Sequence, residues 1–207
     1  MFEKKAQKAF NIHHFTLSTC LFGFLNSAPI CCVFVPFFKA NGLLPLQLSI
    51  VMSVRRLSRM IFESFFGLIF DRFGAKPVFF TGKLLKLLCF LTLLFGKPCF
   101  SVFLMAMFLS GVANSTIYGK ISSMIYNNLS ATDTLKKFPK VLCLYHFCFG
   151  GSVATMSFIA GALLKVGFGY NFLIYVSIFI TLLSCVVLYF FIPSKKDYGN
   201  SRFHGGA

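Results

Sequence analysis

The chain has 207 residues, of which 57% are hydrophobic and 12% are charged, with a mean hydropathy of +0.80 and a formal net charge of +15. Soluble domains typically contain about 45–50% apolar and about 25% charged residues, so this composition excludes an ordinary water-soluble fold. The favoured surroundings are a lipid bilayer, whose hydrocarbon core is crossed by about 20 apolar residues in a helix.

Six apolar stretches follow one another along the sequence, each close to the length of a membrane-spanning helix. They cover residues 15–38, 43–69, 77–96, 98–125, 141–165 and 170–193. The stretches are continuous rather than alternating in polarity, which argues against the strands of a membrane β-barrel. We therefore predict an all-α membrane protein whose six-helix transmembrane domain covers residues 15–193, between an amino-terminal segment (1–14) and a polar tail (194–207).

The positive charges are distributed unevenly over the predicted loops. If six helices alternate in direction, one side of the membrane has Lys4, Lys5, Lys8, Arg72, Lys76, Lys136, Lys137, Lys140, Lys195, Lys196 and Arg202. The other side has Lys39, Lys97 and Lys165. Basic loops remain in the cytoplasm, so we expect a multi-pass protein of a cell membrane, of the bacterial inner-membrane type, with both termini cytoplasmic. A charge split between loops also argues against nucleic-acid binding.

The polar residues form no recognisable catalytic or metal-binding pattern. The cysteines fall mostly inside apolar stretches without a CxxC spacing, where they behave as small hydrophobic residues. No nucleophile elbow, zinc-protease motif or phosphate-binding loop is present in the sequence. We expect no catalytic residues, no metal site and no cofactor, and we expect the lipid bilayer to be the main partner of the chain.

The sharpest local pattern lies between the second and third predicted helices and comprises Gly67, Asp71, Arg72, Gly74 and Lys76. Gly67 allows another helix to approach closely, and Gly74 permits a tight turn. Asp71 is able to accept hydrogen bonds from the positive end of a neighbouring helix or to pair with a base. Lys76 is suited to the negatively charged inner leaflet. A plain charged turn that obeys the charge asymmetry is the alternative interpretation.

This segment resembles the G-x-x-x-D-R-x-G-x-[KR] signature of the major facilitator superfamily, which also lies between the second and third helices. Glu63 resembles a glutamate that one branch of the superfamily carries four residues before the signature glycine. The resemblance implies a transporter that moves a small solute by alternating access, and it implies a cytoplasmic gate formed by Asp71, Arg72 and Lys76. Ala75 departs from the basic residue that is usual in this signature.

The length of the chain fits one six-helix half of such a fold, in which the solute site lies between two halves. The chain is therefore expected to be the amino-terminal half of the architecture. Three alternatives stay open: a truncated, non-transporting fragment; a half that forms a homodimer or pairs with a separate second half; and a six-helix membrane assembly partner without a transport role.

The second predicted helix carries Arg55, Arg59 and Glu63 at intervals of four residues, which places them on one helical face. An arginine near the bilayer centre costs about 2.5–3.5 kcal/mol on insertion scales, and it usually faces a bundle interior or a wet cavity. We expect Arg59 to pair with Glu63, which leaves Arg55 or its neighbour Arg56 for an anionic solute or another helix. The alternative is a self-neutralising ladder that serves packing.

Further polar residues occur in the first, fourth and fifth predicted helices. By resemblance, Asn26, Asn114 and Tyr118 line a solute path, although such residues also form hydrogen-bonded seams between membrane helices. His146 is able to titrate in a proton-coupled cycle, or to sit at the interface with its hydrogen bonds satisfied. We expect Lys120 to lie near the cytoplasmic end of its helix and to extend toward the membrane surface.

Overall fold

The structure, a computed structural model, describes residues 29–96, 99–117, 120–131 and 134–191, together with residues 17, 20, 21 and 23. Every regular element in these ranges is a helix, which confirms the all-α prediction. Four helical stretches of the described part are long and apolar enough to cross a membrane, namely Ala75–Phe95, Phe100–Tyr126, Leu135–Lys165 and Tyr170–Tyr189.

The first predicted helix is interrupted within the described residues. It contains α2 (Pro29–Cys32) and α3 (Phe34–Ala40), separated at Val33, whose backbone angles of φ −115° and ψ 20° are not helical. Pro36 causes this break, because it has no N–H to offer the carbonyl of Cys32 and its ring crowds that carbonyl.

The second and third helices, α4 (Pro45–Phe73) and α5 (Ala75–Phe95), are joined by the single residue Gly74. Gly74 has φ 90°, a left-handed conformation that favours glycine. The 29 residues of α4 span about 44 Å, which exceeds the roughly 30 Å hydrocarbon core. α4 is therefore longer than the core, and it ends at Phe73, past the predicted end at residue 69.

The remaining helices lie close to the predicted stretches, with one further interruption. α6 (Phe100–Ser115) and α7 (Lys120–Ala131) cover the fourth stretch, and Thr116 and Ile117 form a turn after α6. The 3₁₀-helix η1 (Leu135–Lys137) leads into α8 (Phe138–Lys165), which is followed by α9 (Tyr170–Phe191). The turn between α8 and α9 contains Gly167, whose φ is 100°.

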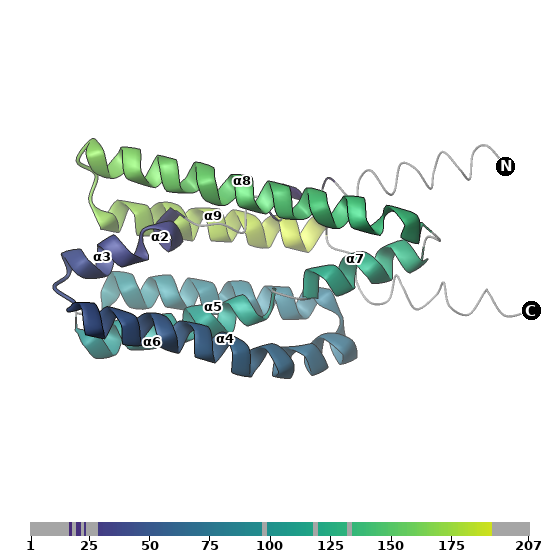
Figure 1. Cartoon of the computed structure of the whole chain (residues 1–207), viewed down its shortest axis with the longest axis horizontal. Coiled ribbons are helices and arrows are strands. Elements are labelled where there is room, and N and C mark those ends of the chain that lie inside the picture. Colours follow the sequence, from purple (N-terminus) through teal and green to yellow (C-terminus); the bar gives the residue numbers. More distant parts are fainter. Residues whose placement is uncertain are drawn as a thin grey trace, which may run out of the picture.

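The long helices run close to one common direction (Figure 1). α6 packs against both α4 and α5, α5 also packs against α9, and α2 packs against α8 and α9. Helices that are distant in the sequence therefore meet inside the bundle. This arrangement places the polar residues of α4, α5 and α6 close to one another.

Two apolar clusters fill the bundle at different levels along the helices. On α4 one cluster contains Phe70 and the other contains Val51, and on α5 they contain Phe79 and Phe90 respectively. Between these two levels lies a set of buried polar side chains, here called the polar layer. Its members are Ser58, Lys83, Ser110, Ser152, Ser177, Thr181 and Ser184.

Candidate solute path and cytoplasmic gate

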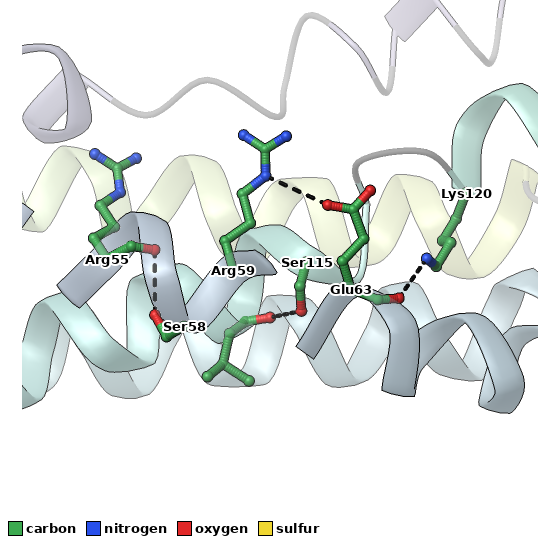
Figure 2. Close-up of polar contacts among 7 residues, drawn as sticks. Arg55, Ser58, Arg59, Glu63, Ser115 and Lys120 are labelled. Carbon is green, nitrogen blue, oxygen red and sulfur yellow. Dashed lines mark hydrogen bonds and ion pairs between the residues drawn. The ribbon is translucent and has the colours of Figure 1, made fainter. Parts of the chain in front are cut away.

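Arg55, Arg59 and Glu63 project from the same face of α4 (Figure 2). Nε of Arg59 lies 3.8 Å from Oε2 of Glu63, and these side chains are 41% and 37% exposed. A partly exposed pair at this spacing contributes about 0.3–0.5 kcal/mol, so it is a weak stabilising contact. The predicted Arg59–Glu63 pair is therefore present, and Arg55 stands outside it.

Arg55 points toward the part of the bundle where α3 and α4 meet. Its guanidinium carbon lies 5.3 Å from the centre of the ring of Phe34, a buried residue of α3. This is the distance range of a cation–π interaction. Phe34 belongs to an apolar cluster that also contains Val51 of α4 and Phe90 of α5. Arg55 therefore lies on the inner side of α4, against a ring of this shared cluster.

The neighbouring Arg56 lies on a different face of α4. It is exposed, and it lines an open groove of about 550 Å³ together with Ser53 and Met60. The two adjacent arginines thus have different surroundings, one inside the bundle and one on its outer surface.

Two lysines of α5 belong to the same neighbourhood as Arg55. Lys83 is 3% exposed, and Lys86 is half-buried with its Nζ 5.6 Å from the centre of the Phe90 ring. Phe90 and Phe34, the ring that Arg55 faces, belong to the same apolar cluster. Neither lysine was predicted from the sequence as a site residue. The signal was present, because two lysines three residues apart share one face of an otherwise apolar helix.

A close approach of α4 and α6 holds this region together. The Ser58 hydroxyl lies 2.8 Å from the carbonyl oxygen of Val54, as a donor within α4, and 3.4 Å from that of Phe108 on α6. A Cβ atom on Gly111 would overlap the Ser58 hydroxyl and the backbone carbonyl of Arg55. Only a residue without a side chain fits at this contact.

Lys120 does not extend to the membrane surface, so that prediction is wrong. The residue is 9% exposed, and its ammonium group donates a hydrogen bond of 2.8 Å to the backbone carbonyl of Glu63 (Figure 2). The ammonium nitrogen also lies 3.5 Å from the position that a Cβ of Gly67 would occupy. An acceptor on α4 inside the bundle satisfies the lysine, so its side chain turns inward and connects α7 to α4.

The residues of the signature surround the junction of α4 and α5. Asp71 and Arg72 are exposed in the last turn of α4, and the guanidinium carbon of Arg72 lies 5.5 Å from the centre of the Phe73 ring. Nζ of Lys76, in the first turn of α5, lies 4.6 Å from the ring centre of Tyr189 on α9. The signature residues thus connect the ends of α4, α5 and α9. Lys120 of α7 also reaches this part of α4, because its ammonium group lies beside Gly67.

Of the other predicted path residues, the structure describes Asn114 and His146, and neither forms a hydrogen bond or ion pair with the charged face of α4 within the described residues. Asn114 is partly buried at the end of α6, where its backbone carbonyl accepts a hydrogen bond of 3.2 Å from the N–H of Ile117. His146 is exposed on α8, and its ring centre lies 5.3 Å from that of Tyr145. Asn26 and Tyr118 lie outside the described residues.

The titratable side chains of the described part do not gather into a metal site. Among the residues searched, no group of three or more His, Cys, Asp or Glu side chains is placed to hold a metal ion. The cysteines of the described part form no disulfide bonds with one another.

Comparison with known proteins identifies the family. A search of curated proteins found no match to this chain. A family model described as Major Facilitator Superfamily matches residues 15–206, which is nearly the whole sequence. The matched range includes the charged face of α4, the α4–α5 junction and all the described helices. The chain therefore belongs to the Major Facilitator Superfamily.

Proposed function

We propose that the chain is a secondary transporter, or one half of a transporter, that moves a small solute across a cell membrane by alternating access. The observation that carries the proposal is the family match over residues 15–206. The signature residues at the α4–α5 junction and the charged side chains within the bundle support it. The proposal assigns a binding and positioning role to the polar residues and no catalytic role.

The cytoplasmic gate is proposed to consist of Asp71, Arg72 and Lys76. These residues lie at the junction of α4 and α5, and Lys76 contacts Tyr189 on α9. A change in their contacts would therefore be transmitted to three helix ends at once. Gly74, with its φ of 90°, supplies the tight connection that keeps Asp71 and Lys76 close in the chain.

A second six-helix unit is proposed as the partner that completes the solute site. In this fold the site lies between two such units, and the described helices form one of them. The exposed face of α8 supports the proposal, because a Cβ atom on Gly150, Gly151 or Gly161 would meet nothing within 4 Å. Small residues on an uncovered face suit close packing of another membrane helix. The unit is a second copy of this chain or another six-helix segment.

The orientation proposed from the charge distribution places both termini in the cytoplasm of a bacterial cell. Arg72 lies in the last turn of α4 and Lys76 in the first turn of α5, while Lys136 and Lys137 directly precede α8. These basic residues lie at one end of the bundle. Their excess over the opposite end fits retention of these loops on the cytoplasmic side of the inner membrane.

Efflux from proteoliposomes tests the transport proposal. Vesicles containing the purified chain are loaded with a defined mixture of small acids, sugars, amino acids and amines, and the solutes that leave are measured by mass spectrometry. We expect at least one solute to leave faster than from protein-free vesicles. Identical efflux from both kinds of vesicle, with the protein folded and inserted, contradicts transport by this chain alone and favours the assembly-partner alternative.

A further inference from the structure

The membrane-embedded part of the bundle contains many more positive than negative side chains. The sequence has five acidic residues, Glu3, Glu63, Asp71, Asp133 and Asp197. Of these, Glu63 is the one that lies in the middle of a described helix, where it pairs with Arg59 at 3.8 Å. Arg55 on α4, Lys83 and Lys86 on α5 and Lys120 on α7 add four positive side chains to the described helices. Buried charges in a membrane are costly unless they find a partner of opposite sign.

Arg55 and Lys86 are the two cations in this group whose side chains are half-buried rather than fully packed. Within the described residues the salt bridge formed is that between Arg59 and Glu63, so neither Arg55 nor Lys86 has a carboxylate partner there. Each lies instead against an aromatic ring, Arg55 at 5.3 Å from Phe34 and Lys86 at 5.6 Å from Phe90. A ring face attracts a cation without neutralising its charge.

The two cations lie against one apolar cluster, although they come from different helices. The rings that they face, Phe34 of α3 and Phe90 of α5, both belong to this cluster. Ser110, a buried polar residue of α6, precedes Gly111, which packs against the backbone carbonyl of Arg55. Two positive charges and a hydroxyl-bearing residue therefore occur in this part of the bundle.

We propose that Arg55 and Lys86 bind the solute as a small organic anion that carries a carboxylate or phosphate group. A guanidinium group donates paired hydrogen bonds to such oxygens, and an ammonium group adds a second positive charge. The half-buried state of both side chains leaves part of each open to a ligand. This inference rests on the proposed transport function, since it names the class of solute.

Binding of two anions to the purified full chain in lipid nanodiscs tests the site. Succinate represents a carboxylate and inorganic phosphate represents a phosphate, while neutral succinamide matches the size of succinate; all are compared at equal ionic strength. We expect succinate or phosphate, but not succinamide, to bind with saturation in calorimetry. The anion that binds distinguishes the two kinds of group. Absence of saturable binding by both anions, or equal binding of succinamide, overturns the proposal.

Three variants of equal charge change locate the anion. Arg55→Gln and Lys86→Gln are expected to weaken binding at least tenfold each. Arg56→Gln removes the same charge from the outer groove of α4 and is expected to change binding less than twofold. A larger loss with Arg56→Gln than with Arg55→Gln would place the anion in the outer groove and refute the proposed site.

A chemical probe of the same place does not depend on the choice of anion or on tight binding. The thiols of Cys31 and Cys32 are partly exposed, so their modification by an anionic and by a cationic methanethiosulfonate is measured by mass spectrometry. We expect the anionic reagent to be favoured, and this preference to fall severalfold in Arg55→Gln and Lys86→Gln that elute as monodisperse protein. An unchanged preference in both variants argues against a positive site.

The outcome is separable from that of the transport proposal. Efflux of a neutral solute without binding of either anion would refute the anion site and leave transport in place. Saturable anion binding at Arg55 and Lys86 without efflux of any solute would support the anion site and refute transport by this chain alone.

Discussion

The ammonium nitrogen of Lys120 lies 2.8 Å from the backbone carbonyl oxygen of Glu63, and this hydrogen bond joins residues 57 positions apart in the sequence. The bond connects α7 to the middle of α4, one helical turn before Gly67, the first residue of the signature. It therefore links the helix that carries the proposed gate to the second part of the fourth span.

Replacement of Lys120 by methionine keeps the length of the side chain but removes the donor. We expect α7 to open more often, because a polar bond between membrane helices contributes about 0.6 kcal/mol on average. Hydrogen exchange measured by mass spectrometry is then about threefold faster in peptides from residues 121–131. Lys165→Met, at the exposed end of α8, serves as the control. Equal exchange in α7 of both variants would show that the bond does not hold this helix.

Gly111→Ala is expected to be strongly destabilising. The new methyl group would overlap the backbone carbonyl of Arg55, which cannot move without separating α4 from α6. Overpacking of this kind typically costs about 1–3 kcal/mol. Unfolding in a graded detergent titration measures the loss. Gly150→Ala, where a Cβ meets nothing within 4 Å in a single copy of the chain, is the matched control, and in monomeric protein it is expected to unfold at or above the wild-type midpoint.

Asp71→Asn tests the proposed gate. The side chain is exposed, so we expect the stability of the fold to change by less than about 0.5 kcal/mol. Efflux of the transported solute from proteoliposomes is expected to fall about tenfold, which corresponds to about 1.4 kcal/mol. Lys165→Gln provides a control that changes one surface charge far from the junction. Normal efflux in Asp71→Asn would remove this residue from the gate.

Cys99 provides a native marker of orientation. It is exposed and lies between α5 and α6, at the end of the bundle opposite the α4–α5 junction. A membrane-impermeant maleimide added to intact cells is expected to label it, and Cys99→Ser to lose this label. A cysteine introduced as Lys137→Cys should react only after the membrane is permeabilised. Labelling of residue 137 in intact cells would invert the proposed topology.

Local sequence chemistry predicted the helices well where one residue controls the boundary. Pro45 begins α4, and Gly74 separates α4 from α5 because it adopts a left-handed conformation. The spacing of four residues was also sufficient to predict the Arg59–Glu63 pair, since both partners lie on one helix.

Contacts between different helices could not be predicted from local sequence patterns. The bond from Lys120 to Glu63 and the fit of Gly111 against Ser58 depend on which helices become neighbours, and no local pattern contains that information. The spacing of Lys83 and Lys86 was visible in the sequence, but it did not reveal that Lys86 and Arg55, from different helices, face rings of one apolar cluster.

The contact at Gly111 has a practical consequence for studies of motion in this protein. Because the backbones of α4 and α6 approach closely there, we expect these two helices to move together, so that spin labels on them report a constant separation. Such a pair of labels serves as a reference distance. Changes in the distance from a label on α6 to one on α8 can then be assigned to displacement of α8 rather than to distortion of the reference.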